Sequence, residues 1–228
     1  MKKRSRLRPF RAIVVWAISL IAGLYAFCGL GIVLLRWIDP WTSMVQIERR
    51  VQAQRAHHPY KKHYEFVSLE NISPNLQHAV VAAEDDRFRQ HHGFDWVEMQ
   101  KVLEDDVKRQ RLGRGGSTIT QQLVKNLFLT TERSFVRKGV ESSLVPLAEA
   151  FLTKDRILEL YLNVIEWGPG IYGAQAASQH YYRIEASAVN REQAARLAAV
   201  IPLPLKWKPA QMNDYAAVIL ERMQQTGW

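Results

Sequence analysis

The chain has 228 residues, which is enough for a membrane anchor and one domain of ordinary size. Its formal net charge of +9 at pH 7 comes largely from a short N-terminal tail, residues 1–11, which holds six of the lysines and arginines. No base-reading motif accompanies this charge, so we expect no nucleic acid partner. A single cysteine, Cys28, excludes an internal disulfide, and the fold must be held by its core.

Residues 12–35 form an apolar run without a charged residue. At a rise of about 1.5 Å per residue, a helix of this length spans the roughly 30 Å hydrocarbon core of a bilayer. The basic tail before it predicts a cytoplasmic N-terminus, with Trp37 and Trp41 at the outer interface. A cleaved signal peptide is the alternative, but its apolar core would be only about 7–15 residues and would end at a small-residue cleavage site.

The chain therefore divides into a cytoplasmic tail (1–11), a transmembrane helix (12–35), a membrane-proximal segment (36–63) and an exported domain (64–228). The segment 36–63 is polar and cationic, which favours contact with anionic lipid headgroups. Its histidines are not expected to bind metal, because adjacent histidines point in different directions on most backbones. A short extended piece is expected at 63–69.

A buried helix is expected to deliver Glu84 at its C-terminal end. Ser73 and Pro74 are typical of an N-cap and a first helical turn, and the apolar run 79–83 precedes Glu84. A carboxyl group at the end of a buried helix meets low dielectric, which raises its pKa toward the range that a general base needs. The simpler interpretation is a helix end whose acids, 84–86, face water.

The next segment predicts a second helix. Gly93 closes the acidic motif, and Asp95 with Glu98 three residues later resembles a capping box. The helix is expected to run from Trp96 to about Arg109. Its apolar stripe predicts a face in the core, formed by Trp96, Met99, Val102 and Leu103.

A glycine-rich loop leads into the third helix. Gly113, Gly115 and Gly116 precede Ser117, which is suited to cap that helix. A loop of this kind before a helix N-terminus is a recurrent anion site, although the Lys-Ser/Thr pair of a Walker A loop is missing. The helix displays a row of polar side chains: Thr118, Gln121, Gln122, Lys125 and Asn126. An ordinary amphipathic surface helix is the alternative.

Ser134 is expected to cap a helix from Phe135 to about Leu152. Two cations one turn before Glu141 share its face at i to i+4 and i to i+3 spacing. An exposed ion pair of this kind contributes little, but several cations gathered together would bind a pyrophosphate. That cationic cluster would consist of Lys125, Arg133, Arg137 and Lys138.

The remaining helices have clear start signals. They are expected after Thr153, Gly173, Asn190 and Asn213. The last two are interpreted as scaffold. Strand signals are sparse and no internal repeat is present, so the sequence predicts a mainly α fold.

Five segments, taken in chain order, resemble the five motifs of the peptidoglycan glycosyltransferases of glycosyltransferase family 51. The first two are Glu84-Asp85-x-x-Phe88-x-x-His91-x-Gly93 and Gly116-Ser117-Thr118-Ile119-Thr120-Gln121-Gln122-Leu123-x-Lys125-Asn126. The others are Arg137-Lys138-x-x-Glu141, Ile157-Leu158-Glu159-x-Tyr161-Leu162-Asn163 and Gly170-x-x-Gly173-Ala174-x-x-Ala177.

The resemblance implies a lysozyme-like, mainly helical domain with a small jaw lobe, preceded by one N-terminal transmembrane helix. It implies lipid II, a disaccharide-peptide on undecaprenyl pyrophosphate, and the nascent glycan strand as substrates. The chain would be a single-pass protein of the bacterial inner membrane with a periplasmic catalytic domain. Membrane lipid and other proteins of cell-wall synthesis or division would be its partners. The chain ends soon after the last motif, which predicts a member without a transpeptidase domain.

The same resemblance assigns roles to individual residues. It places the catalytic acid on Glu84 and a second essential acid on Glu141. A divalent cation, Mg²⁺ or Mn²⁺, would be held partly by Glu141, and no organic cofactor is implied. Pyrophosphate contacts fall on Lys125, Arg133, Arg137 and Lys138. Further substrate-binding positions match Ser117, Thr118, Gln121, Gln122, Asn126, Asp85, Phe88 and His91.

In this scheme Glu84 takes the proton from the 4-hydroxyl of an acceptor N-acetylglucosamine, which displaces the lipid pyrophosphate from the donor chain with inversion. Two alternatives remain. A membrane-anchored muramidase or lytic transglycosylase also uses a glutamate at a helix end, but it has no use for the cationic motifs. A non-catalytic scaffold for cell-wall proteins would tolerate Glu84→Gln.

Overall fold

The computed structural model of the chain describes residues 7–109, 116–132 and 134–228. Helices make up most of it, which confirms the predicted mainly α class. In chain order they are α1 (Leu7–Leu34), α2 (Met44–Arg55), α3 (Pro74–Glu84), α4 (Trp96–Arg109), α5 (Ile119–Phe128), α6 (Phe135–Phe151), α7 (Lys154–Val164), α8 (Ala174–Tyr182), α9 (Arg191–Ala198) and α10 (Asn213–Gln225). Short 3-10 turns are η1 (Leu69–Asn71), η2 (Ala186–Ala188) and η3 (Pro209–Gln211).

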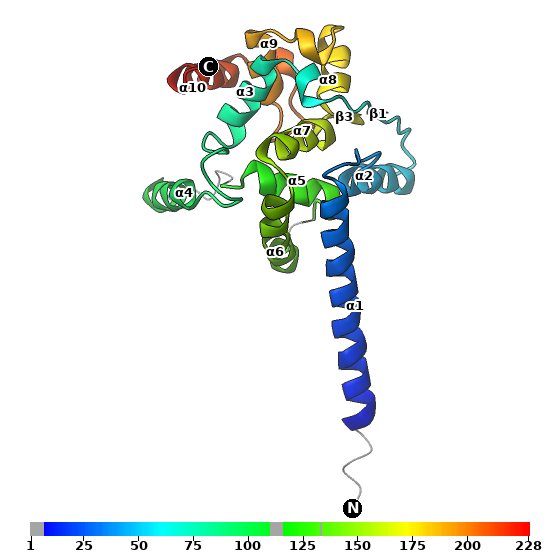
Figure 1. Ribbon diagram of the computed structural model, residues 1–228. Helices are drawn as coiled ribbons and strands as arrows, with labels where there is room; N and C mark the ends of the chain where they lie inside the picture. Colours follow the sequence, from blue (N-terminus) through cyan, green and yellow to red (C-terminus); the bar gives the residue numbers. More distant parts are fainter. Residues whose placement is uncertain (1–6, 110–115, 133) are drawn as a thin grey trace, which may run out of the picture.

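The first helix, α1, projects away from the other helices as one long rod (Figure 1). Its residues Arg11–Leu34 are long and apolar enough to cross a membrane. Most side chains along this stretch are exposed, among them Trp16 at 76% and Phe27 at 71%. A helix that is apolar on all sides and not surrounded by protein is suited to a lipid environment.

The end of α1 is attached to the rest of the protein at two places. The Tyr25 hydroxyl donates a hydrogen bond of 2.9 Å to the Ser143 carbonyl oxygen of α6, along which α1 packs. Just beyond the helix, the guanidinium of Arg156 donates to the carbonyl oxygens of Leu35 at 2.8 Å and Ile38 at 3.1 Å. These contacts connect the apolar helix directly to α6 and α7.

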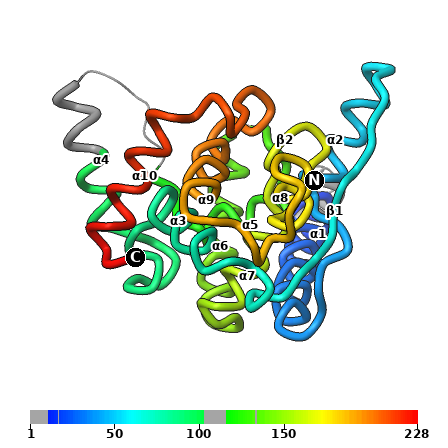
Figure 2. The backbone as a smooth tube through the Cα atoms, turned by 90° about the horizontal axis from the view of Figure 1, so that it is seen from above, coloured from blue at the N-terminus to red at the C-terminus, as the bar shows by residue number. Residues whose placement is uncertain are grey.

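The helices after α2 pack mainly in two groups around one core. In the first group α9 packs against α3 and α10, and Figure 2 shows α3 beside α9. In the second group α5 packs against α6 and α7. Both contribute fully buried side chains, such as Leu76 of α3 and Leu158 of α7. Asp85, just after α3, accepts a hydrogen bond of 2.9 Å from the Ile119 N–H at the start of α5, which joins the two groups.

A small sheet packs against α8. Its strands are β1 (His63–Tyr64), β2 (Glu166–Gly168) and β3 (Ile171–Tyr172), in the order β1-β3-β2. Strand β1 runs parallel to β3, with His63 opposite Ile171, and β2 runs antiparallel to β3. The extended piece predicted at 63–69 is therefore a strand of two residues.

Several predicted helix starts are confirmed by capping hydrogen bonds. The side chains that accept from the backbone N–H three residues later are Asp95, Ser134, Thr153 and Asn190. Helix α5 differs by one residue: Thr118 rather than Ser117 is its N-cap, in a capping box with Gln121. The Ser117 side chain therefore does not cap the helix, and its hydroxyl oxygen instead accepts a hydrogen bond from Lys138.

The predicted core position of the α4 stripe is wrong for Trp96. This side chain is 69% exposed, and it stacks on Phe94 with ring centroids 5.5 Å apart. Figure 1 shows α4 standing to one side of the other helices. An amphipathic pattern predicts a helix with one apolar face, but it does not say what covers that face.

Gly173, at the N-cap of α8, has a backbone conformation that favours glycine. Its φ is +84°, and a Cβ there would lie 2.6 Å from the Asn163 carbonyl oxygen. Gly173→Ala should therefore destabilise the protein by about 2–4 kcal/mol, through backbone strain and the forced contact. Denaturant unfolding measures this, with Gly139→Ala as control, because a Cβ at Gly139 meets nothing within 4 Å. A loss no larger than the control's would contradict the strain.

Candidate active site

A cavity of about 930 Å³ opens beside the C-terminal end of α3. Its walls come from the end of α3, from α4 and the segments on either side of it, from α5, and from the C-terminal part of the chain. The lining residues are Ala82, Ala83, Glu84, Asp85, Asp86, Asp95, Glu98, Val102, Gly116, Ser117, Thr118, Gln122, Lys125, Ile201, Pro202, Leu203, Trp207, Tyr215, Arg222 and Gln225. Two predicted site residues of opposite charge, Glu84 and Lys125, therefore share one cavity.

Glu84 is the last residue of α3. Its Oε2 accepts a hydrogen bond of 2.6 Å from Nε2 of Gln122 on α5. Burial raises the pKa of Glu84, whereas the Gln122 hydrogen bond and the charge of Lys125 oppose the rise. The direction agrees with the prediction from sequence. A carboxyl group with a raised pKa that lines a cavity is suited to accept a proton from a bound hydroxyl.

Lys125 lies one turn after Gln122 on α5 and lines the same cavity. Burial lowers the pKa of Lys125. The negative charges of Glu141 and Glu84 oppose this lowering, and the positive charge of Arg137 adds to it. The ammonium group is therefore within electrostatic reach of both predicted acids. It is placed to bind an anionic group in the cavity.

Glu141, on α6, is 2% exposed. Its Oε2 accepts from Nη1 of Arg137 at 2.7 Å, and its Oε1 accepts from Nζ of Lys138 at 2.5 Å. Lys138 also donates to Oγ of Ser117, a lining residue, at 3.4 Å. Among the described residues Glu141 does not itself line the cavity. It stands behind two cations and orients them, and a metal ion at this carboxylate would be repelled by both.

The other predicted substrate-binding residues fall into two sets. Those that line the cavity are Asp85, Ser117, Thr118 and Gln122. Those that are buried and, within the described part of the chain, do not line it are Phe88, His91, Gln121 and Asn126. Gln121 completes the capping box of α5, and Asn126 donates to the Gln122 carbonyl oxygen at 2.7 Å, so both support a lining residue. Arg133 lies outside the described residues.

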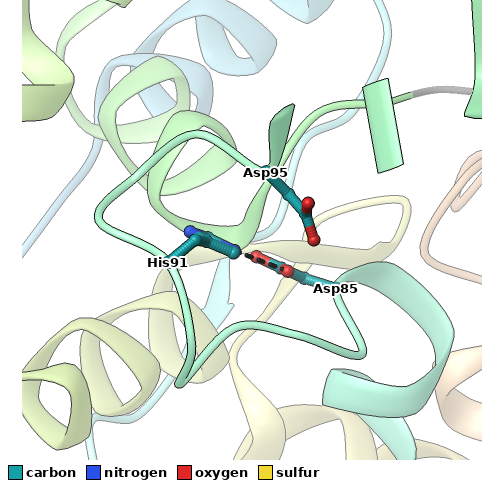
Figure 3. Close-up of side chains that lie close together, drawn as sticks. All are labelled: Asp85, His91 and Asp95. Carbon is teal, nitrogen blue, oxygen red and sulfur yellow. Dashed lines mark hydrogen bonds and ion pairs between the residues drawn. The ribbon is translucent and has the colours of Figure 1, made fainter. Parts of the chain in front are cut away.

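One group of side chains has the composition of a metal site. Ligand atoms of Asp85, His91 and Asp95 lie within 4.8 Å of one another (Figure 3). The Gly93 N–H donates to Nδ1 of His91 at 3.2 Å, so Nε2 carries the proton and donates to Oδ1 of Asp85 at 2.8 Å. The Ile119 N–H donates to the other Asp85 oxygen. Both imidazole nitrogens and both Asp85 oxygens have hydrogen-bond partners in the protein, so the group is held together without an ion.

Asp85→Asn tests this interpretation. An amide has only one oxygen, so it cannot accept from both His91 and Ile119, and the variant should lose about 2–4 kcal/mol of unfolding free energy. The loss should be the same with Mg²⁺ and with EDTA, because no ion contributes. Denaturant unfolding under both conditions measures it. A loss that appears only when metal is present would contradict the structural assignment.

The sequence did not reveal one wall of the cavity. Tyr215, Arg222 and Gln225 of α10 line it, together with Trp207 from the loop before. Their spacing of seven and three residues places the three α10 side chains on one helix face. The charge of Arg222 also reaches Glu84 and lowers its pKa. The only available signal was this spacing of tyrosine, arginine and glutamine in a helix interpreted as scaffold.

Comparison with known proteins decides the family. The family model described as Transglycosylase matches residues 50–224. The chain belongs to the transglycosylase family. The resemblance found from five short motifs is thereby confirmed over most of the chain. The transglycosylase match also includes Tyr215 and Arg222 of the α10 wall, which lies outside all five motifs.

Curated relatives agree with this assignment, and each is named biosynthetic peptidoglycan transglycosylase. The protein from Shewanella oneidensis (strain MR-1) is 41% identical over 229 residues, covering 97% of this chain and 95% of the relative. The protein from Pseudomonas aeruginosa (strain PAO1) is 42% identical over 200 residues, 86% of each chain. The protein from Thiobacillus denitrificans is 50% identical over 175 residues, 76% of this chain and 75% of the relative. This transglycosylase is thus similar to them over three quarters or more of their length.

Proposed function

We propose that the chain is a peptidoglycan glycosyltransferase that polymerises lipid II into glycan strands for the cell wall. The observation that carries the proposal is the shared cavity of Glu84, a carboxyl group with a raised pKa, and Lys125, a half-buried ammonium group. A proton acceptor and a cationic group in one cavity suit a transfer in which a hydroxyl attacks while a pyrophosphate leaves. The names of the relatives support the same reaction.

In the proposed reaction Glu84 takes the proton of the 4-hydroxyl on the acceptor N-acetylglucosamine. The acceptor oxygen attacks the anomeric carbon of the donor chain. The bond from that carbon to the lipid pyrophosphate breaks as the new glycosidic bond forms, so the configuration inverts in one displacement. Undecaprenyl pyrophosphate is released, and Glu84 returns its proton to solvent.

The cations of α5 and α6 neutralise the charge of the departing pyrophosphate. Arg137 donates from Nη1 to Oε2 of Glu141 at 2.7 Å, so its charge stands behind the cavity rather than in its wall. Lys138 reaches the cavity at Ser117. Burial lowers the pKa of Lys125, and the charge of Glu141 opposes this lowering.

A divalent cation, Mg²⁺ or Mn²⁺, remains a prediction. The carboxylates of Asp85 and Glu141 already accept hydrogen bonds from protein groups, which an ion there would have to share or displace. The proposed steps therefore use only the protein's own cations. The predicted contact of Arg133 with pyrophosphate likewise remains a proposal.

A membrane anchor suits a substrate that cannot leave the bilayer. We propose that α1 is a single span in the bacterial inner membrane, with the basic tail in the cytoplasm and the catalytic domain in the periplasm. Exposed apolar side chains on α6, Phe135 at 98% and Val136 at 79%, support lipid contact by the helix against which α1 packs. Other proteins of cell-wall synthesis or division remain candidate partners.

The test is the reaction of the purified full-length chain with lipid II in detergent. Consumption of lipid II should yield glycan strands that a muramidase digests, with release of undecaprenyl pyrophosphate. A lytic enzyme would instead solubilise finished sacculi and leave lipid II unchanged, and a scaffold would do neither. Folded protein that does not consume lipid II would overturn the proposal.

A further inference from the structure

Gln122, the residue that contacts Glu84, is held at every polar atom of its side chain. Its Nε2 donates to Oε2 of Glu84 at 2.6 Å and to the Ser117 carbonyl oxygen at 3.4 Å. Its Oε1 accepts from the Tyr161 hydroxyl at 2.9 Å. Both sides of the amide therefore have partners.

The Ser117 carbonyl oxygen and the Glu84 carboxylate fix which side of the amide faces Glu84, because both accept from the amide nitrogen. A backbone carbonyl oxygen only accepts, so Ser117 requires the amide nitrogen on its side. The Tyr161 hydroxyl donates to the amide oxygen on the other side. A reversed amide would place Oε1 against the Ser117 carbonyl and the Glu84 carboxylate, and the hydrogen bonds to both would be lost.

Tyr161 supplies the partner of the amide oxygen in this orientation and so helps to hold the side chain in place. It is fully buried on α7, and α7 packs closely against α5, which carries Gln122. Burial raises the pKa of the Tyr161 hydroxyl well above its usual value, and the charges of Glu84 and Asp85 raise it further. The hydroxyl is therefore a neutral donor at every pH at which the enzyme works.

We propose that Tyr161 is a positioning residue that orients Gln122. The Gln122 amide then donates to Oε2 of Glu84, and Oε1 of Glu84 is left to take the proton of the substrate. The inference rests on the proposed role of Glu84 as general base. Tyr161 itself touches no substrate, since within the described part of the chain it does not line the cavity.

Tyr161→Phe should change the pH dependence of turnover. Without the hydroxyl the amide oxygen of Gln122 loses its hydrogen-bond partner, so the amide is held less firmly against Glu84. Because a donated hydrogen bond favours the carboxylate, its weakening raises the pKa of Glu84. We expect the acidic limb of the pH profile of kcat/KM to move up by about one pH unit, with activity on that limb lower by about tenfold. The deficit should close toward the plateau at higher pH.

Tyr181→Phe is the matched control. The Tyr181 hydroxyl donates to the Trp167 carbonyl oxygen at 2.9 Å, the same length as the Tyr161 bond, and Tyr181 does not line the cavity within the described residues. Its pH profile should superimpose on that of wild type. If Tyr161→Phe instead lowers the rate equally at all pH values, or leaves the profile unchanged, Tyr161 is only structural and the inference fails.

A double variant tests whether Tyr161 acts through Gln122. Gln122→Ala should itself shift the acidic limb, and adding Tyr161→Phe should cause no further shift. An additional shift of about one pH unit in the double variant would show another route and overturn the inference.

Carbon-13 NMR separates this inference from the proposed function. With labelled glutamate, the Glu84 carboxyl signal is assigned by its disappearance in Glu84→Gln and titrated in wild type and Tyr161→Phe. An upward shift of the titration midpoint in Tyr161→Phe supports the positioning role without any turnover. No shift in a variant whose wild type polymerises lipid II overturns the inference alone, whereas a shift in a protein that never consumes lipid II overturns only the proposed function.

Discussion

Glu84→Gln is expected to reduce lipid II polymerisation by about 10²- to 10⁴-fold, because the amide cannot take the proton of the attacking hydroxyl. The amide has the same size as the carboxyl group, and one of its ends remains able to bond Gln122. Consumption of lipid II by equal amounts of folded wild type and variant measures the loss. Glu70→Gln is the control, since Glu70 is exposed and lies in η1, away from the cavity-lining residues.

The same variant should be more stable than wild type at neutral pH. Burial raises the pKa of Glu84 in the folded protein above its unfolded value, so wild type loses stability as the pH rises from the unfolded pKa through the folded one. The amide does not ionise and escapes this loss. Thermal unfolding should therefore show a higher midpoint for Glu84→Gln at neutral pH and a vanishing difference in acid. If Glu84→Gln still polymerised lipid II, or lost activity only because it unfolds, the role of Glu84 as general base would be contradicted.

Lys125→Met should reduce polymerisation by about 10²- to 10³-fold, since it removes the cation of the cavity that stabilises the leaving group. It should also raise the pKa of Glu84, because the charge of Lys125 lowers that pKa in wild type. The acidic limb of the pH profile would then move upward along with the loss of rate. Both effects are measured in one series of lipid II assays across pH.

Lys61→Met is the control for this prediction. Lys61 is exposed and lies beside a separate, smaller pocket of about 210 Å³ with Arg49 and Glu166. Removing its charge should change neither the rate nor the pH profile. A comparable decrease in both variants would show that overall charge, and not the cavity cation, governs the reaction.

The sequence predicted the parts of the site that depend on local pattern. The Ser73-Pro74 start and the apolar run before Glu84 sufficed to place this acid at a helix end, and burial of that end follows from the same run. The spacing of Arg137 and Lys138 before Glu141 likewise predicted the pairing that the structure shows. These features depend on residues within one or two helical turns, where spacing determines geometry.

The sequence did not predict features that depend on distant partners. Helix α2 was missed because its residues are mostly polar and show no apolar stripe. In the structure its N-terminal end is capped by Ser43, and Gln46 in its first turn is buried. Trp96 was placed in the core, although its helix borders a cavity and its side chain is 69% exposed. The α10 wall was missed because a regular helix pattern does not show that Arg222 lies opposite an acid 138 positions earlier, at Glu84.

The attachment of α1 to α6 through Tyr25, and to α7 through Arg156, has a mechanical consequence in the proposed membrane setting. A catalyst connected rigidly to its span keeps a constant height above the lipid surface, so the growing polymer must slide past a fixed point. When the bilayer is thicker or thinner than the span, the whole body tilts or shifts with it, at a cost of a fraction of a kcal/mol per Å of mismatch. Bilayer thickness would then tune how well the reacting sugar meets its base.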